Sequence, residues 1–536
     1  MANYSAYHPY PSARHSTYAK NGMVATSQPL AAQAGLDILK KGGNAIDAAI
    51  ATAACLTVVE PTSNGIGGDA FALVWVKGDL HGLNASGFAP KNISIDKLKE
   101  AGYDEIPETG WAPVTVPGLP SAWAALSKRF GKLPLTEVLK PAIDYAENGY
   151  PLSRTLARVW KQEYRRFKQL LDGEEFESWF ETFAPNGRAP EIGEVWASPG
   201  HASTLRSIAE TNAESFYRDE LAEKIAKFSK EHNGYLTADD LAEYYPEWVD
   251  PINVNYRGYD VWEIPPNGQG LVALQALNIL EGFDFPVKDS VDTYHKQIEA
   301  MKLAFADGGK YIADSRYMSQ DINGLLSKEY AAQRRRLIGE EALMPEAGKP
   351  PKGGTVYLAT ADSEGNMVSY IQSNYIEFGS GLVVPGTGIS LQNRGHSFSF
   401  DPNHDNALEP RKRPYHTIIP GFLTKDNVAV GPFGVMGGFM QPQGHLQVVM
   451  NKIDFDLNPQ ASLDAPRWKW VEGKTVELEH SVPNHIALAL KDRGHDVRIA
   501  LEPYSFGRGQ IIWRDPETGV LTGGTEHRTD GIVAAW

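Results

Sequence analysis

The spacing of apolar residues predicts two helices near the start of the chain, within residues 27–60. Ser27 and Pro29 stand where the cap and the first turn of a helix belong. Gly42-Gly43 follows as an end signal, and Asn44 is placed to cap the second helix. The next stretch, TSNGIGGDAFALVWV, combines a glycine-rich turn with the alternating pattern of a strand.

Helical spacing returns in residues 155–246, where Leu221, Ile225 and Phe228 lie four and three positions apart. A strand and a turn are predicted for 256–270 (YRGYDVWEIPPNGQG), and two further helices follow them. Up to this point the chain is predicted to be largely helical.

The pattern changes after residue 339. The stretch GEEALMPEAGKPPKGG (339–354) has no periodicity and little to bury, so we expect it to be exposed and mobile. Beyond Thr355 the chain is rich in strand patterns. VYLATAD and MVSYIQS flank the turn SEGN and predict a hairpin, and QPQGHLQVVMNKI predicts a later helix. A helical first part and a strand-rich second part favour a layered α+β enzyme with a seam between residues 354 and 355.

Composition narrows the class of protein. The 536 residues are 42% hydrophobic and 22% charged, with a net charge of −15, which is typical of a globular protein and argues against a nucleic-acid partner. No run of eighteen apolar residues predicts a membrane span. The N-terminus lacks a signal-like apolar core, and Cys55 is the single cysteine, so we expect a cytoplasmic protein. Neither a phosphate-binding loop nor a zinc-ligand pattern is present, so we expect no cofactor and no metal.

Thr355 raises a specific chemical question, because a pliable Gly-Gly run leads directly into it. A threonine hydroxyl becomes a good nucleophile when a base is adjacent, and a free α-amine on the same residue can be that base. An internal threonine gains such an amine only when the preceding peptide bond is cut. Flexible glycines would help the backbone to bend for an N→O acyl shift. Taken alone, the pattern favours an exposed loop that enters an ordinary edge strand.

The surrounding blocks resemble the γ-glutamyltransferase family of N-terminal-nucleophile hydrolases. TVYLATADSEGNMVSYIQSNYIEFGSG, GTGISLQNRG, RKRPYHTIIP and GVMGG are similar to the family's small subunit. GMVATSQPLAAQAGLDILKKGGNAIDAAIATAACLTVVEPTSNGIGGDAF and VPGLPSAWAALSKRFGKLPLTEVLKPAIDYAENGYPLS are similar to its large subunit. The resemblance implies a four-layer αββα sandwich made as one chain. It also implies self-cleavage into a large subunit (1–354) and a small subunit (355–536) that stay together as a heterodimer, which could pair further.

The same resemblance assigns residues to the chemistry. Cleavage would fall between Gly354 and Thr355, and Thr355 would be the nucleophile. Ser373 would place a second hydroxyl beside it, across the predicted hairpin. Gly437 and Gly438 match the family's oxyanion-hole glycines, whose backbone N–H groups stabilise a developing negative charge.

The substrate end departs from the family pattern. Ser86 stands where family members have an arginine that binds glutamate's α-carboxylate, and Arg394 and Ser397 stand where a glutamine and an aspartate bind its α-amine. The remaining candidate binding residues are Asn374, Tyr375, His416 and Thr417. The site thus loses a carboxylate suited to an ammonium and gains a guanidinium that can bind a carboxylate through two hydrogen bonds.

These changes favour a self-processing amidohydrolase that acts on a small acidic amide, such as oxamate or a dicarboxylic acyl amide. One alternative is a true γ-glutamyltransferase or glutathione hydrolase with a rebuilt glutamate site. Another, from a different class, is a non-catalytic binding scaffold. A carboxylate that binds an ammonium would distinguish the first two, and the joint presence of Thr355, Ser373, Gly437 and Gly438 argues against the third.

Overall fold

The structure is a computed structural model that describes residues 14–345 and 354–536. Within the described residues, two sheets of seven strands each form its centre. The first sheet runs in the order β19 (Ile532–Ala535), β2 (Gly22–Thr26), β10 (Gly354–Asp362), β11 (Met367–Tyr375), β3 (Asp69–Val76), β4 (Asp79–Ala85), β7 (Glu247–Val249). The second runs in the order β1 (Thr17–Ala19), β18 (Leu521–Thr525), β17 (Arg508–Arg514), β13 (Val428–Met436), β12 (Gly421–Lys425), β9 (Tyr259–Glu263), β8 (Ile252–Tyr256).

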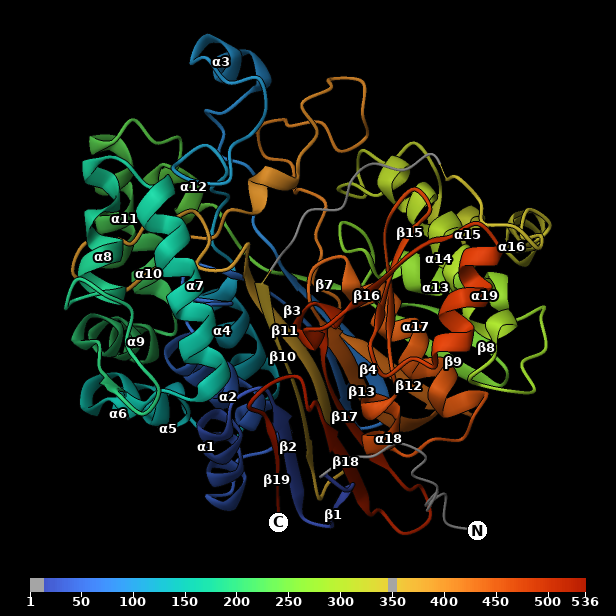
Figure 1. Ribbon diagram of the computed structural model, residues 1–536. Coiled ribbons are helices and arrows are strands. Elements are labelled where there is room, and N and C mark those ends of the chain that lie inside the picture. The colour runs from blue at the N-terminus through green and yellow to red at the C-terminus, as the bar shows by residue number, and fades with distance from the viewer. Residues whose placement is uncertain (1–13, 346–353) are drawn as a thin grey trace.

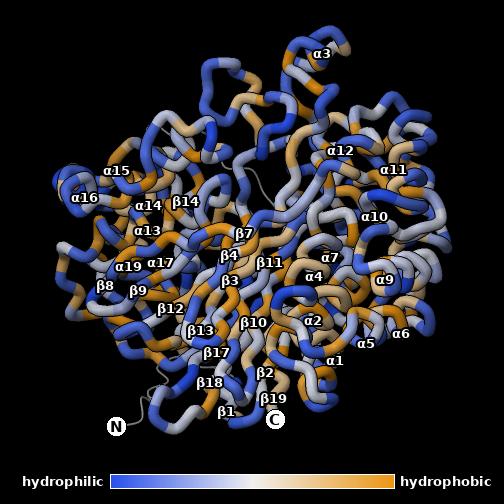
Figure 2. Tube along the Cα trace, turned by 180° about the vertical axis from the view of Figure 1, so that it is seen from behind, coloured by the Kyte–Doolittle hydropathy of each residue, from blue (hydrophilic) through white to orange (hydrophobic). Residues whose placement is uncertain are grey.

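The two sheets lie face to face, and apolar side chains fill the space between them. This inner core includes Phe71, Ile371, Phe422 and Ile512, all fully buried. Figure 1 shows the sheets in the middle of the molecule with helices on both outer sides, and Figure 2 shows hydrophobic positions along the central strands. The architecture is the four-layer αββα sandwich that the sequence resemblance implies.

One helical layer covers the first sheet, and α1 and α2 pack directly on its strands. Its helices are α1 (Pro29–Lys40), α2 (Ala45–Val59), α4 (Leu119–Phe130), α5 (Leu135–Val138), α6 (Lys140–Asn148), α7 (Arg154–Leu170), α8 (Glu177–Phe183), α9 (Pro199–Thr211), α10 (Glu214–Arg218), α11 (Glu220–Glu231) and α12 (Ala238–Ala242). The opposite layer covers the second sheet. It contains α13 (Gly270–Leu280), α14 (Val291–Tyr311), α16 (Lys328–Arg335), α17 (Met440–Ile453), α18 (Pro459–Asp464) and α19 (Asn484–Asp492).

Smaller elements complete the chain. A three-stranded sheet combines β14 (Trp468–Glu472), β15 (Thr475–Glu479) and β16 (Asp496–Ala500), and a two-stranded one pairs β5 (Tyr150–Pro151) with β6 (Val195–Trp196). Two short helices, α3 (Ile95–Glu100) and α15 (Ile322–Leu325), lie in connections. Three 3-10 turns are η1 (Glu174–Phe176), η2 (Arg394–Ser397) and η3 (Pro503–Phe506).

Local sequence signals located several boundaries correctly. Asn44 caps α2 in a capping box with Asp47, and α17 covers the predicted late helix. The hairpin β10–β11 has the predicted strands and turn. The predicted role of Ser27 is wrong: Gln28 stands at the cap position of α1, and the Ser27 hydroxyl hydrogen-bonds the Glu60 carboxylate at 2.5 Å instead. A buried charged acceptor outcompetes the local backbone for this hydroxyl.

The predicted mobile joint at 339–354 falls largely on residues 346–353, which lie outside the described residues. In the described part of the chain, no helix combines the length and apolar character needed to cross a membrane. Cys55 is buried within α2, as its apolar surroundings predict.

Candidate active site

Thr355 lies near the start of β10, in the middle of the first sheet, and only 1% of it is exposed. The β10–β11 register shifts between Gly354 and Val356, so Thr355 forms an irregularity in the ladder. Its Oγ1 donates a hydrogen bond to the Gly354 carbonyl oxygen at 2.7 Å and lies 3.4 Å from Ser373 Oγ. The hydroxyl therefore already lies against the carbonyl of the peptide bond that the sequence marks for cleavage.

The Ser373 hydroxyl is held between three partners. It donates to the Gly354 carbonyl oxygen at 2.6 Å and accepts from the Tyr375 backbone N–H at 2.7 Å. An Arg394 guanidinium N–H lies 3.4 Å from the same oxygen. Because two donors fill the acceptor side of Ser373, its own proton points at Gly354 and polarises that carbonyl. The predicted contact between Ser373 and Thr355 is confirmed.

Arg394 is fully buried beside this pair. One guanidinium nitrogen donates to Thr417 Oγ1 at 2.7 Å, and the guanidinium carbon lies 4.1 Å from the centre of the Tyr375 ring. Burial lowers the pKa of Arg394 to about 10, against the opposing effect of Tyr375 and Asp69, so the side chain stays cationic at neutral pH. Its Nε has no hydrogen-bond partner among the described residues. A buried cation with spare donors is suited to bind an anion.

Asp69 and His416 form a second buried pair next to Arg394. Asp69 Oδ2 lies 3.1 Å from His416 Nε2, and Asp69 Oδ1 accepts backbone N–H groups of Gly87 and Gly118, each at 3.3 Å. Burial raises the pKa of Asp69 to about 7, although Arg394 opposes the shift. Burial lowers the pKa of His416, with Arg394 acting in the same direction, so the imidazole is neutral.

Sequence reasoning did not identify Asp69 as a site residue, although a signal existed. It stands directly after the glycine-rich turn GIGG, at the mouth of an otherwise apolar strand. The sheet pairs Asp69 with Ser373, because β3 and β11 are neighbours. Only this long-range pairing brings the carboxylate to Ser373.

Gly437 and Gly438 follow β13 with φ angles of 137° and 59°, in the region that favours glycine. A Cβ on Gly437 would lie 3.2 Å from Gly507 Cα. Gln269, a second residue that the sequence analysis missed, links this turn to Thr417. Its Nε2 donates to the carbonyl oxygens of Gly438 at 2.9 Å and Thr417 at 2.5 Å. The diglycine turn is thereby connected through Thr417 to Arg394.

Three other residues noted in the sequence have partners of their own. Asn374 points away from Ser373, as alternation along a strand requires, and donates to Ser390 Oγ at 3.0 Å. The Ser397 hydroxyl donates to the carbonyl oxygens of Arg394 and Tyr415. The hydroxyl of Ser86 donates to the Asn84 side chain at 2.7 Å. Substrate-binding roles for Asn374 and Ser397 remain predictions, and Tyr375 is the aromatic residue that contacts Arg394.

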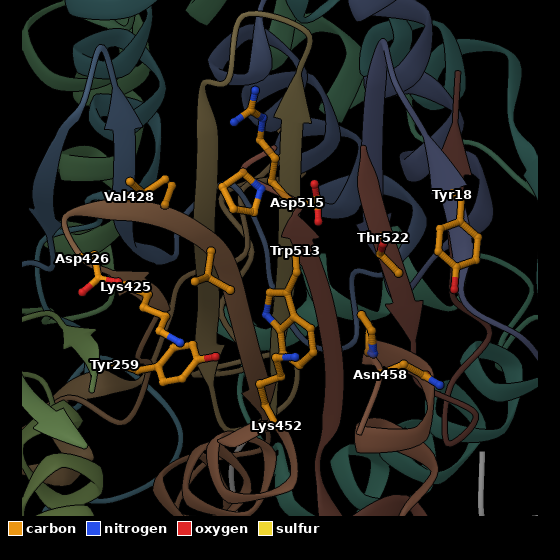
Figure 3. A pocket seen from close by; sticks show the side chains of 15 residues that line it. Tyr18, Tyr259, Lys425, Asp426, Val428, Lys452, Asn458, Trp513, Asp515 and Thr522 are labelled. Carbon is orange, nitrogen blue, oxygen red and sulfur yellow. The ribbon is translucent and has the colours of Figure 1, made fainter. Parts of the chain in front are cut away.

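A separate pocket of about 210 Å³ lies on the second sheet, at the end that is away from the diglycine turn (Figure 3). Tyr18, Tyr259, Lys452 and Trp513 are among its lining residues. Trp513 lies five residues along β17 from Arg508, which pairs with Met436 just before the diglycine turn. Five residues of strand span roughly 17 Å, so this pocket is distinct from the Thr355 site.

Known proteins are similar to this chain along most of its length. A sequence model described as Gamma-glutamyltranspeptidase matches residues 31–536. The chain is 38% identical to the Glutathione hydrolase-like YwrD proenzyme of Bacillus subtilis, over 95% of this chain and 98% of that protein. It is 34% identical to the Oxamate amidohydrolase proenzyme of Klebsiella pneumoniae, over 97% of this chain and 99% of that protein.

Solved structures agree with these sequence relationships. A cephalosporin acylase from Bacillus halodurans superposes with a TM-score of 0.96 at 67% identity, over 99% of this chain and 98% of that one. The gamma-glutamyltranspeptidase of Helicobacter pylori superposes with a TM-score of 0.55 at 30% identity, over 63% of this chain and 97% of that one. The chain belongs to the gamma-glutamyltranspeptidase family, and it is an N-terminal-nucleophile hydrolase or acyltransferase.

Proposed function

We propose that this protein cuts its own chain between Gly354 and Thr355 and then hydrolyses small acidic amides with the Thr355 exposed by that cut. The first step starts from the hydrogen-bonded geometry of the intact chain. Thr355 Oγ1 attacks the Gly354 carbonyl carbon while Ser373 donates a hydrogen bond to the carbonyl oxygen. The C–N bond breaks, an ester forms, and water hydrolyses it. The products are the fragments 1–354 and 355–536.

The second step uses the new α-amine of Thr355. The hydroxyl attacks the substrate's amide carbonyl, and the amine accepts its proton. Backbone N–H groups of Gly437 and Gly438 would stabilise the oxyanion, each by about 3 kcal/mol. The amine part of the substrate leaves, and water hydrolyses the acyl-enzyme. Several relatives are named proenzymes, which supports the self-cleavage step of this reaction.

The single observation that carries the substrate class is Arg394. A fully buried cation with an unpartnered Nε, in contact with Ser373, favours a substrate whose acyl part ends in an acid group. Oxamate is such an acid amide, and it gives its name to the amidohydrolase relative. The structural neighbour is named for its action on cephalosporins.

A second candidate is hydrolysis of a γ-glutamyl amide, and Asp69 favours it. This carboxyl group lies within the site and could pair with an α-ammonium. Both its oxygens already have partners, however. Burial also raises its pKa to about 7, so near neutral pH it is ionised less often than an ordinary aspartate. The relative named glutathione hydrolase-like keeps this candidate in the test.

The deciding experiment has two parts. Purified protein should appear as two fragments whose masses match 1–354 and 355–536, whereas Thr355→Ala should stay one chain. The cut enzyme is then assayed on oxamate, a glutaryl amide, a γ-glutamyl amide and a neutral amide of equal size. Preference for the acids that lack an α-amine supports the proposal. Exclusive γ-glutamyl turnover would transfer it to the second candidate, and an uncut, inactive wild type would reduce the protein to a scaffold.

A further inference from the structure

A buried carboxyl group lies directly against the residue that supplies the scissile carbonyl. A Cβ placed on Gly354 would stand 2.9 Å from Glu377 Oε2 and 3.0 Å from Glu377 Cδ. Glu377 follows the end of β11 by two residues, so the hairpin that positions Ser373 also positions this carboxyl. Glu377 Oε2 is buried and has no hydrogen-bond partner within the described residues.

The backbone of Glu377 is also unusual. Its φ angle is 29°, in a region that non-glycine residues rarely occupy and that costs on the order of 1–3 kcal/mol. Glycine would satisfy that conformation without strain, and an apolar residue would avoid a buried carboxyl oxygen that has no partner among the described residues. A position that combines both costs next to a reacting bond points to a chemical role.

Several titratable or charged side chains act on the charge of Glu377: Glu60, Glu163, Arg166, Tyr504 and Arg508. Burial raises the pKa of Glu377 to about 8, and the nearby negative charge of Glu163 adds to that shift, while Arg508 opposes it. The carboxyl therefore holds its proton at neutral pH and can give it up without a large free-energy cost.

The cleavage chemistry needs such a group. In the intact chain the hydroxyls of Thr355 and Ser373 both point at the Gly354 carbonyl oxygen. The Thr355 hydroxyl is the attacking group, so only Ser373 can keep donating to this oxygen and stabilise the negative charge that develops on it. The departing nitrogen of Thr355 has to receive a proton before it becomes an amine, so another proton donor is required close to the scissile bond.

We propose that Glu377 is the proton-transfer residue of self-cleavage, an inference that rests on the proposed self-processing function. As the Thr355 Oγ1–Gly354 C bond forms and the C–N bond breaks, Glu377 gives its proton to the Thr355 nitrogen, directly or through one water molecule. The proton that leaves Thr355 Oγ1 returns to the Glu377 carboxylate. Glu377 is therefore protonated at the end of the acyl shift, as it was at the start. No other reactant is consumed until water hydrolyses the ester.

The test follows self-cleavage of freshly translated, full-length precursor from a cell-free system, between pH 5.5 and 9.5, by denaturing gel and intact mass. Wild type should cut fastest below pH 8 and slow about tenfold per pH unit above it. Glu377→Gln, which keeps the shape but not the proton, should cut at least 30-fold more slowly at pH 7 and lose this pH dependence. Glu377→Asp should retain measurable cutting with a shifted limb.

Glu163→Gln is the matched control, because it removes a neighbouring carboxylate without touching Gly354. It should cut at close to the wild-type rate at pH 6.5, with the high-pH limb displaced to lower pH, since the lost negative charge no longer raises the pKa of Glu377. Thermal unfolding beside the uncut Thr355→Ala protein checks that each variant is folded.

The outcomes separate two kinds of failure. A wild-type chain that never cuts overturns the self-processing function itself. A wild type that cuts, together with a Glu377→Gln protein that cuts at the same rate and with the same pH profile, overturns only the role of Glu377. A Glu377→Gln protein that unfolds while Glu377→Asp cuts with an unshifted profile makes the residue structural and also overturns it.

Discussion

The Arg394 guanidinium lies over the ring of Tyr375, with its central carbon 4.1 Å from the ring centre, and both side chains are fully buried. The aromatic face holds the cation in place while leaving edge nitrogens available for hydrogen bonds. One of these nitrogens contacts Thr417, and another approaches Ser373. The cation is thus held beside Ser373, which in turn contacts Thr355.

We predict that Arg394→Ala lowers kcat/KM for an acidic amide by about 2–4 kcal/mol, because the substrate's acid group loses a charged partner in a buried site. A neutral amide of the same size should lose much less. Arg394→Lys should restore only part of the activity, because a single ammonium cannot replace the planar guanidinium.

Self-cleavage serves as the internal control for these variants, because it needs no bound acid. Both Arg394 variants should therefore still yield two fragments. Equal losses on the acidic and the neutral amide would mean that Arg394 supports the structure of the site instead of binding the acid group.

A second prediction concerns Gly354. Among the described residues, Gly354 is not one of the glycines with a positive φ angle. The reason for a glycine here is therefore the lack of room for a side chain, not a left-handed backbone. An added Cβ would lie 2.9 Å from Glu377 Oε2 and 3.1 Å from the Glu377 Cα, and the latter cannot move away as a side chain could. We expect Gly354→Ala to slow self-cleavage at least tenfold in a gel time course.

Gly309→Ala is the matched control, because a Cβ at that position in α14 would meet no atom within 4 Å. It should cut like the wild type. If Gly354→Ala also cuts at the wild-type rate, the packing of Glu377 against Gly354 does not matter for the reaction.

A third prediction concerns the fragments after cleavage. β10 pairs with β2 on one side and β11 pairs with β3 on the other, so the hairpin of 355–536 lies between strands of 1–354 in one sheet. Separating the fragments would break both ladders and expose the apolar faces of the sheet. Size exclusion in native buffer should show both fragments in a single peak.

Thr355→Ala, which should stay uncut, provides the reference elution volume for that peak. The same volume would show that cutting leaves the assembly intact, and its apparent mass would report any further pairing. Two separate peaks in native buffer would contradict the shared-sheet arrangement.

Local sequence patterns predicted the parts of the site that depend on neighbouring residues. The family resemblance paired Ser373 with Thr355, and the spacing of the hairpin β10–β11 made their approach geometrically reasonable. The capping of α2 by Asn44 is local in the same way. Family resemblance, not periodicity, supplied the four-layer sandwich.

The remaining parts depend on contacts between distant segments. Asp69 reaches Ser373 only because β3 pairs with β11, and Gln269 joins Thr417 to Gly438 across more than 140 residues. Glu377 lies within a block that resembles the family, but nothing in its neighbours along the sequence indicates that its carboxyl packs on Gly354. The contacts of Asp69 and Gln269 join segments that are far apart along the chain, so local patterns carry no signal for them.

The last prediction concerns Asp69 and the pH dependence of stability. Burial raises the pKa of this carboxyl to about 7 in the folded protein, against an ordinary value of about 4. Between these two values the folded state holds a proton that the unfolded state has lost. The free energy of unfolding therefore falls as pH rises from about 4 to about 7, by an amount on the order of 4 kcal/mol from this group.

Asn at position 69 cannot titrate, yet its carbonyl oxygen can still accept the N–H groups of Gly87 and Gly118. We therefore expect Asp69→Asn to lose less stability than its parent between pH 5 and pH 7. Urea unfolding at several pH values, in the uncut Thr355→Ala background, measures the difference while other titrating groups cancel. Asp79→Asn, at the exposed start of β4, should follow the parent curve. If the Asp69→Asn and parent curves stay parallel over this range, the folded protein does not hold a proton on Asp69.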